Sequence, residues 1–349
     1  GHVFPALAVA RALVEKGATV SWIGTARGLE SELVPAHGYE LDLIGITGLR
    51  GKGLAGWLVA PVRIARAVWQ AFGIIRRRRA DAVLGMGGFV TGPGGVAARL
   101  LRRPLIIHEQ NALAGLTNRL LARLANPVLQ AFPEALPGAE VTGNPVRREI
   151  SAVAPPAQRY EGRTGALRLL VIGGSQGAQA LNRGVPDALA ALAPEHRPRV
   201  RHQAGRKNLD ATRANYRDAG VEAEAVPFLD DMAAAYAWAD LVVCRSGALT
   251  VSELAAAGVP SLLVPFPYAV DDHQTVNGRF LSEAGAAVLL PQPELDSRLT
   301  ALLEEYCADP SEGRRRLRAM AEAARDLARP EATAAVAEIC LDRARGRRA

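Results

Sequence analysis

Cysteine is scarce in this sequence, and its spacing excludes one class of metal site. The 349 residues include only three cysteines, Cys244, Cys307 and Cys340, and no two of them form a CxxC pair. An odd number of widely spaced cysteines argues against a structural zinc site and favours a reducing compartment.

Long apolar runs are also missing. The best candidate for a membrane-spanning helix, residues 57–79, is interrupted by Arg63 and Arg66, and its longest charge-free piece, AVWQAFGII, has nine residues. A helix needs about 20 predominantly apolar residues to cross a bilayer. We therefore expect no transmembrane helix, and we expect no signal peptide.

The overall composition is typical of a globular protein with anionic partners. Hydrophobic residues make up 49% of the chain and charged residues 22%, in a chain long enough for two domains. The net charge of +7 favours phosphates, nucleotides or an anionic lipid surface as partners. Nucleic acid is a weaker candidate, because the basic residues are not interleaved with aromatic residues that could stack on bases.

Apolar segments of β type alternate with segments of helical spacing in both halves of the chain. This alternation predicts parallel sheets with helices on both faces. A Pro-, Ala- and Arg-rich stretch, residues 151–166, is typical of a linker. We predict an α/β fold with two doubly wound, Rossmann-like domains, residues 1–150 and 167–349, an active site in the cleft between them, and C-terminal helices in the second domain. The predicted strands are residues 19–24, 81–86, 104–109, 127–132, 167–174, 239–244, 260–266 and 286–290.

Glycines are concentrated directly after three of these strands. The segments are GMGGFVTGPGG (85–95), GGSQGAQALN (173–182) and RSGALTVSE (245–253). At the carboxyl ends of parallel strands, small residues let backbone N–H groups approach an anion, and the next helix presents its positive end. None of the segments has the GxxxxGK[ST] pattern of a P-loop or a clean GxGxxG followed by an acid. The three segments together therefore predict a phosphate or nucleotide site of another kind.

Acidic residues near these loops have two possible roles. Glu253 lies too deep in its helix to cap it, so it either faces solvent or accepts hydrogen bonds from the hydroxyls of a ribose. Asp230 and Asp231 are predicted to cap a helix rather than to bind a metal. No DxD-like acid pair occurs where a metal-bridged nucleotide would need one, so we expect neither a metal nor a cofactor.

Eight motifs occur in the order and approximate spacing of one enzyme family: GHVFPALAVA, LGMGGFVTGPGG, HEQNALAGLTNR, GNPVR, GGSQGAQALN, FLDDMAAAYAWAD, CRSGALTVSELAAAG and HQTVNGRFLSEAGAA. In these motifs the chain resembles the MurG family of bacterial glycosyltransferases, and the resemblance extends over nearly the whole chain. It implies a GT-B fold and an inverting transfer of N-acetylglucosamine from UDP-N-acetylglucosamine to the C4 hydroxyl of the muramoyl unit of lipid I, which forms lipid II. Without an acid pair for a metal, we expect this transfer to be metal-independent.

The resemblance implies donor-binding residues in the second half. Ser175 matches a serine that contacts phosphate, although a serine here could simply cap the helix. Leu229 is expected beside the uracil, and His273 and Gln274 match a Gln-Gln pair at the donor sugar, with His in place of the first Gln. The helix segment expected to receive the diphosphate and ribose comprises Ala248, Leu249, Thr250, Val251, Ser252 and Glu253.

The resemblance places catalysis and acceptor binding in the first half. His2 and Glu109 compete for the role of general base, the group that takes the proton of the acceptor hydroxyl. Asn111 can donate and accept hydrogen bonds toward sugar hydroxyls, and Arg147 is either a guanidinium of the donor site or a surface arginine. The remaining expected contacts are Gly1 for substrate, and Gly87, Gly88, Gly92 and Gly94 for the acceptor diphosphate.

The start of the chain departs from the family pattern, in which a strand and GGTGGH precede the first helix. Only Gly1 and His2 of that segment are present, so we expect the first strand and part of the glycine loop to be missing and the sheet to carry unpaired backbone groups. Two alternatives stay open. One is a GT-B transferase that uses another nucleotide sugar, and the other is a regulator that binds a nucleotide sugar without turnover.

The stretch between Asp42 and Asp81 contains no acidic residue. Its basic residues alternate with apolar ones, which is typical either of a buried amphipathic helix with a solvated basic turn or of a helix lying in a membrane interface. The second interpretation makes residues 57–79 the contact with an anionic membrane surface. It fits the location that the resemblance implies, peripheral at the cytoplasmic face of the bacterial inner membrane, where other cell-wall synthesis proteins could be partners. The apolar residues are Trp57, Leu58, Val62, Val68, Trp69, Phe72, Ile74 and Ile75, and the basic ones are Arg50, Lys52, Arg63, Arg66 and Arg76–Arg79.

Overall fold

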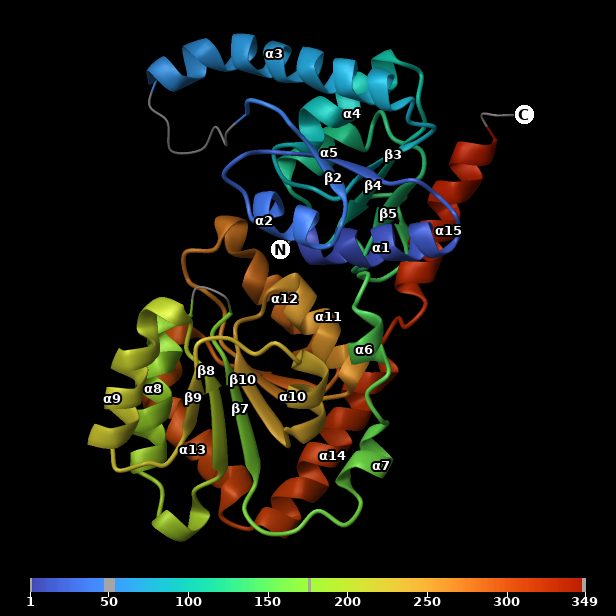
Figure 1. Ribbon diagram of the computed structural model, residues 1–349. Helices are drawn as coiled ribbons and strands as arrows, with labels where there is room; N and C mark the ends of the chain where they lie inside the picture. The colour runs from blue at the N-terminus through green and yellow to red at the C-terminus, as the bar shows by residue number, and fades with distance from the viewer. Residues whose placement is uncertain (1, 47–53, 175–176, 347–349) are drawn as a thin grey trace. The chain divides into compact units, whose positions relative to one another are not determined.

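The computed structural model describes residues 2–46, 54–174 and 177–346. The chain divides into two compact units: unit 1 comprises Gly1–Arg147 and Arg329–Ala349, and unit 2 comprises Arg148–Ala328. Each unit contains parallel strands and helices (Figure 1), which confirms the α/β fold class.

Unit 1 contains two parallel sheets among its described residues, one of β1 and β2 and one in the order β3-β4-β5-β6. All five residues of β4 are buried, as expected for an inner strand of a covered parallel sheet. The strands are β1 Ser21–Gly24, β2 Glu40–Leu43, β3 Val83–Gly85, β4 Leu105–Glu109, β5 Val128–Gln130 and β6 Glu140–Val141. The helices are α1 Val3–Glu15, α2 Glu30–Ala36, α3 Leu54–Arg78, α4 Thr91–Leu100, α5 Leu116–Leu121 and α15 Ala332–Arg345.

The last helix, α15, lies in unit 1, so the prediction that it belongs to the second domain is wrong. Val336 and Cys340 of α15 are buried in one apolar cluster with Val9 of α1, and Figure 1 shows α15 in red beside α1 in blue. Residues spaced like these line one face of a helix, and that face needs an apolar partner. The partner lies far away in the sequence, so chain order alone could not indicate it.

Unit 2 is built on one parallel sheet in the order β12-β11-β10-β7-β8-β9. The direction of winding reverses between β7 and β10, and Figure 1 shows α8 and α9 on one face of the sheet and α11 and α12 on the other. The strands are β7 Arg168–Ile172, β8 Arg199–Gln203, β9 Glu224–Val226, β10 Leu241–Cys244, β11 Ser261–Leu263 and β12 Ala287–Leu289. The α-helices are α6 Arg148–Ser151, α7 Pro156–Tyr160, α8 Gln179–Ala190, α9 Leu209–Asp218, α10 Met232–Trp238, α11 Ala248–Ala257, α12 His273–Ser282, α13 Leu295–Cys307 and α14 Pro310–Asp326. Short 3₁₀ helices are η1 Pro194–His196, η2 Arg206–Asn208, η3 Val270–Asp272 and η4 Gln292–Glu294.

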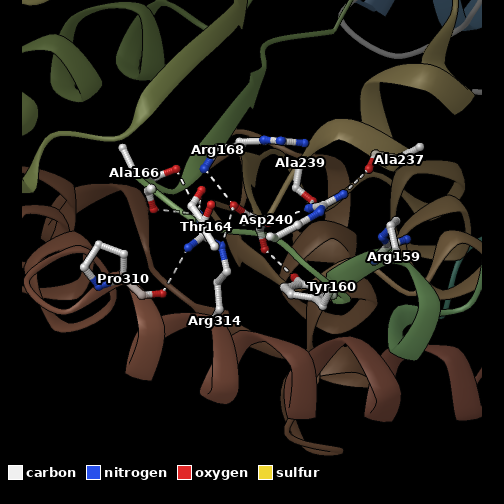
Figure 2. A network of polar contacts seen from close by, with 12 residues as sticks. Arg159, Tyr160, Thr164, Ala166, Arg168, Ala237, Ala239, Asp240, Pro310 and Arg314 are labelled. Carbon is white, nitrogen blue, oxygen red and sulfur yellow. Dashed lines mark hydrogen bonds and ion pairs between the residues drawn. The ribbon is translucent and has the colours of Figure 1, made fainter.

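The stretch 151–166, predicted as a linker, is packed into unit 2. Its Arg163 forms an ion pair with Asp240, which is fully buried at the start of β10, and Arg314 of α14 lies 3.5 Å from the other carboxylate oxygen. The hydroxyl of Tyr160 donates to the backbone oxygen of Asp240 at 2.8 Å. Figure 2 shows this network around Asp240. Charged and aromatic side chains of the stretch therefore hold it in place, which its Pro- and Ala-rich composition did not indicate.

Candidate active site

The switch point of unit 2 lies between β7 and β10, and two of the predicted glycine segments follow these two strands. Gly247 is the N-cap of α11, so no side chain stands over the N–H groups of its first turn. At Gly173, a Cβ atom would lie 2.7 Å from the backbone nitrogen of Ala178, so the chain doubles back tightly there. Helix ends and glycine loops at a switch point form an anion site. Ser175 and Gly1, two of the predicted contacts, lie outside the described residues.

The far end of α11 is fixed by capping. Gly258 adopts a left-handed conformation with φ 63° and closes the helix. Arg159 of α7 donates to the backbone oxygen of Ala257 at 2.6 Å and to that of Gly258 at 2.5 Å. A guanidinium at the negative end of a helix is favourable and satisfies its terminal carbonyl groups. The stretch predicted as a linker thus orients the helix whose other end faces the candidate site.

Glu253 is buried, with 5% of its surface exposed, so it does not face solvent. One of its carboxylate oxygens accepts a hydrogen bond from the hydroxyl of Tyr236 on α10 at 3.2 Å. Tyr236 is itself fully buried, so this bond fixes the orientation of the carboxylate. Tyr236 was not predicted as a site residue, because a tyrosine in an alanine-rich helix indicates only a core residue. Of the rest of this predicted segment, Ala248 and Val251 are buried, and Leu249, Thr250 and Ser252 are half-buried.

Other predicted donor contacts lie on the loop after β9 and at the start of α12. Half-buried Leu229 follows β9, and the next helix is capped by Asp231, whose carboxylate accepts from the backbone of Ala234 at 2.8 Å. The predicted capping role is confirmed for Asp231. His273 and Gln274 begin α12, which follows β11, and the side-chain oxygen of Gln274 accepts from the backbone of Phe266 at 2.9 Å. Gln274 therefore also shapes the loop after β11.

Arg245 is a residue whose role sequence analysis missed. It follows β10, and its guanidinium donates to the backbone oxygens of Val264 and Pro265, each at 3.1 Å, and to Gln292 at 2.6 Å. It also lies 5.4 Å from the centre of the Phe266 ring. These contacts tie the loops after β10 and β11 together beside the N-terminus of α11.

In unit 1, polar side chains at the end of β4 lie on two opposite faces of the strand. Successive residues of a strand point to opposite faces, so His108 and Gln110 share one face and Glu109 and Asn111 share the other. Glu109 is buried and accepts four hydrogen bonds: from the backbone of Asn111 at 2.9 Å, its side chain at 3.2 Å, the backbone of Gly115 at 3.1 Å and the side chain of Asn118 at 2.9 Å. The geometry favours Glu109 as an organiser of the loop between β4 and α5 over Glu109 as a base. Asn111 takes part in that arrangement.

The opposite face holds a chain of hydrogen bonds that ends on His2. His108 is fully buried and lies 2.9 Å from the backbone oxygen of Gly143 through Nε2. Burial lowers the pKa of His108 to about 4, so its ring is neutral near pH 7. The side-chain nitrogen of Gln110 lies 3.3 Å from His108 Nδ1, and the side-chain oxygen of Gln110 lies 2.8 Å from His2 Nδ1. Gln110 therefore holds the ring of His2, the second candidate base.

The glycine loop after β3 supports the ring of His2. Gly87 and Gly88 have φ values of 87° and 78°, which side chains rarely tolerate. A Cβ atom on Gly87 would lie 3.0 Å from two atoms of the His2 ring. Thr91 at the start of α4 donates to the backbone oxygen of Gly87 at 2.5 Å and holds the turn. Gly92 and Gly94 lie within α4, past this turn. In the same unit, half-buried Arg147 lies 5.7 Å from the centre of the Phe4 ring.

Part of the predicted membrane-binding face of α3 is not available to a membrane, because its side chains are buried or form ion pairs. Ile74 and Ile75 are buried in the core of unit 1, and Val68 and Phe72 are half-buried against it. Arg77 and Arg78 form ion pairs with Asp42 at 2.6 and 2.7 Å, and Arg78 also pairs with Glu40. The hydrogen bond from Arg78 is the main reason that the pKa of Asp42 is lowered. The side chains of Trp57 and Leu58 lie outside the described residues, as do Arg50 and Lys52.

Other residues of the predicted face are exposed and, together with Val59, form a stripe along α3. Trp69 is 76% exposed and stacks on Phe72, with ring centres 5.7 Å apart, and Val62 is 69% exposed. Residues spaced three or four apart along a helix share one face, and this face also carries Arg63 and Arg66. The exposed stripe consists of Val59, Val62, Arg63, Arg66 and Trp69. Among the described residues, no helix is both long and apolar enough to cross a membrane.

The fold and these loops define a class of enzyme. Two Rossmann-like α/β units are the architecture of GT-B glycosyltransferases, and in unit 2 two of the glycine loops lie at the switch point of the sheet. Residues 1–130 match the glycosyltransferase family 28 N-terminal domain, and residues 168–335 match the family 28 C-terminal domain. The chain belongs to glycosyltransferase family 28 and, within it, to the MurG family that its motifs resemble.

Individual relatives agree with this assignment over nearly the full chain. A protein of Alkalilimnicola ehrlichii is 58% identical over 99% of this chain and 96% of its own length, and one of Ralstonia nicotianae is 56% identical over 99% and 94%. Both are named UDP-N-acetylglucosamine--N-acetylmuramyl-(pentapeptide) pyrophosphoryl-undecaprenol N-acetylglucosamine transferase. The crystal structure of Acinetobacter baumannii MurG is 41% identical and superimposes with a TM-score of 0.83, over 98% of this chain and 96% of that one.

Proposed function

We propose that this protein transfers N-acetylglucosamine from UDP-N-acetylglucosamine to the C4 hydroxyl of the muramoyl unit of lipid I, with inversion at the anomeric carbon, and so forms lipid II. The observation that carries the proposal is the 58% identity to a named transferase over nearly the whole chain. The switch-point loops of unit 2 supply residues of suitable chemistry for the donor. In unit 1, His2 and the residues around it, Gln110, Gly87 and Gly88, do so for the acceptor.

The donor binds to unit 2 in this proposal. The diphosphate lies at the N-terminus of α11, where backbone N–H groups and the helix dipole stabilise its charge, and near the glycines at positions 173, 174 and 177. Glu253 accepts hydrogen bonds from the ribose, Leu229 lies beside the uracil, and His273 and Gln274 contact the sugar. Charge that builds up on the departing UDP is stabilised by the same helix end without a metal ion.

The acceptor reacts at unit 1. Its C4 hydroxyl attacks the anomeric carbon, the new C1–O4 bond forms as the bond from C1 to the phosphate oxygen of UDP breaks, and His2 takes the hydroxyl proton. Asn111 and the glycine turn at Gly87 and Gly88 contribute to acceptor binding, and Arg147 remains a candidate for the donor sugar. UDP leaves with the electron pair of the broken bond between C1 and its phosphate oxygen, so the reaction needs neither an oxidant nor a reductant.

The membrane contact is the exposed stripe of α3. Its arginines face anionic headgroups while Val62 and Trp69 enter the acyl boundary, which places unit 1 at the surface that holds the lipid-linked acceptor. This proposal includes a peripheral location at the cytoplasmic face of the inner membrane. Other cell-wall synthesis proteins are proposed partners at that face.

Donor choice distinguishes this function from a related transferase. With a lipid I analogue as acceptor, initial rates are measured for UDP-N-acetylglucosamine and for UDP-galactose at equal concentrations. We expect transfer from the first donor to be faster by a factor of roughly 10⁴, because a site that hydrogen-bonds a group of its substrate rejects an analogue that lacks the group by about that factor. Faster transfer from UDP-galactose would show that the donor assignment is wrong.

A further inference from the structure

Gln110 is buried between two histidines, and its amide orientation is determined by its neighbours. Its nitrogen lies 3.1 Å from the backbone oxygen of His108, which can only accept a hydrogen bond. The same nitrogen faces His108 Nδ1, which is an acceptor because His108 donates through Nε2 to the oxygen of Gly143. The Gln110 nitrogen must therefore be the donor end, and its oxygen points to His2.

The oxygen of Gln110 then determines which nitrogen of His2 carries a proton. It lies 2.8 Å from His2 Nδ1, and an amide oxygen can only accept, so Nδ1 must be the donor. In a neutral imidazole, a proton on Nδ1 leaves the lone pair on Nε2. The ring is also confined on one side by the turn at Gly87, where a Cβ atom would lie 3.0 Å from Nδ1.

We propose that Gln110 is a positioning residue that holds His2 in the tautomer with the proton on Nδ1, so that Nε2 accepts the proton of the attacking hydroxyl. The inference rests on the proposed role of His2 as the base. The proton of the acceptor moves to Nε2 and gives an imidazolium that still donates to Gln110 through Nδ1. An amide does not take up that proton, so it stays on the ring until solvent removes it.

The inference assigns a different role to each residue of the His108–Gln110 segment. His108, tied to the oxygen of Gly143, orients Gln110, and Gln110 orients His2. Glu109 faces the other side and organises the loop before α5. Loss of Gln110 should therefore change the tautomer of His2 and the rate of the chemical step, while the binding of UDP by unit 2 stays the same.

Nitrogen NMR of the side chains tests the tautomer directly. The protein is labelled with ¹⁵N in its six histidines, and the His2 signals are assigned by their loss in His2→Asn. In the parent at pH 8, we expect a protonated Nδ1 and an unprotonated Nε2 on His2. A protonated Nε2 in the parent would overturn the inference without the need for any further variant.

Gln110→Met removes the amide oxygen and the amide nitrogen of the side chain at nearly constant volume. We expect a shift of His2 toward the other tautomer, a decrease of kcat by roughly 10- to 100-fold, and an unchanged Kd for UDP. The matched control is Gln130→Met, because Gln130 is equally buried at the end of the neighbouring strand β5 but bonds to Leu136 and Ala139.

The outcomes separate the inference from the function on which it rests. An unchanged His2 tautomer in Gln110→Met, or the same change in Gln130→Met, overturns the role of Gln110. A shifted tautomer with an unchanged kcat shows that His2 is not the base, which overturns the proton transfer but leaves the donor and acceptor assignments intact. Absence of transfer by the parent overturns the proposed function, while the NMR signals still decide the tautomer.

Discussion

At the scale of single residues, the site depends on close contacts that only small side chains permit. Gly87 combines a positive φ with direct contact to the His2 ring. Gly17 has a similar φ of 83° but no atom within 4 Å of its missing Cβ. The two glycines therefore separate the effect of backbone strain from the effect of contact with the ring.

We predict that Gly87→Ala lowers kcat by tenfold or more, as expected when a general base is displaced. Both Gly87→Ala and Gly17→Ala should lose about 1–2 kcal/mol of stability, because an L-residue is strained at such φ values. Melting temperatures and steady-state kinetics of the two variants check this. If Gly17→Ala lost as much activity as Gly87→Ala, strain and not the ring contact would be responsible.

A second prediction at this scale concerns the carboxylate of Glu253. Glu253→Gln keeps the side-chain shape but loses the charge, so UDP should bind more weakly by up to about 1.5–3 kcal/mol, the range for a hydrogen bond to a charged group. Tyr236→Phe removes only the orienting bond and should cost less, about 0.5–1.5 kcal/mol. Calorimetry with UDP measures both. Unchanged affinity in a folded Glu253→Gln variant would remove Glu253 from the donor site.

At the scale of secondary-structure elements, the sequence predicted those with a clear apolar pattern. All eight predicted strands are present, because buried parallel strands contain short apolar runs, such as LII in β4 and LVVC in β10. Four strands were missed: β2, β6, β8 and β9. β8 reads RVRHQ and β2 reads ELDL, so polar and charged residues interrupt the apolar run that marks the predicted strands. β6 has only two residues, EV, and β9 reads EAV, so neither contains an apolar run of three residues.

For the candidate site too, some features could be predicted from the sequence and others could not. Glycine loops at strand ends could be predicted because the turn itself requires glycine, and Glu253 could be singled out by its depth in a helix. Contacts between distant segments, such as Gln110 with His2 and Arg159 with α11, could not be predicted, since they depend on tertiary packing. The period of two along β4 could have indicated that His108 and Gln110 share a face opposite Glu109.

For a single helix, we predict that the exposed stripe of α3 binds anionic vesicles. Val62→Ser together with Trp69→Ser should reduce sedimentation with phosphatidylglycerol vesicles, because both side chains are largely exposed and would enter the acyl boundary. Parent binding should weaken steeply with salt, since each arginine near the surface contributes about 1 kcal/mol of screened attraction. Val141→Ser, at an exposed residue on β6, is the control. Equal sedimentation with neutral and anionic vesicles would rule out this contact.

At the scale of the whole molecule, each unit contains a buried neutral histidine. Burial lowers the pKa of His108 in unit 1 to about 4 and that of His202 in unit 2 to about 3. His202 lies 2.8 Å from the hydroxyl of Tyr216 and 2.9 Å from the side-chain oxygen of Asn182. An unfolded histidine titrates near pH 6.5. Below that pH the unfolded chain binds a proton that the folded chain does not.

Stability should therefore be fully present above pH 6.5 and be lost as the pH falls toward 4, by up to about 1.4 kcal/mol per pH unit for each histidine. Hydrogen exchange of the β4 and β8 amides reports on the two units separately. His202→Gln should flatten the pH dependence for β8 and leave that for β4 unchanged. The same slope for β8 in parent and variant would mean that His202 does not control the acid sensitivity of unit 2.

Transfer of a sugar from a nucleotide to a lipid can be followed directly with a radiolabelled donor. Radiolabelled UDP-N-acetylglucosamine is incubated with the protein, with and without a lipid I analogue and with and without excess EDTA. The label in the lipid fraction is followed over time, and the affinity for UDP is measured on the same preparation. The account predicts that label enters the lipid fraction only when the acceptor is present, and at the same rate with and without EDTA, because the end of α11 and backbone amides stabilise the diphosphate. A preparation that binds UDP but transfers no label would contradict the account and favour a nucleotide-sugar-binding protein without turnover.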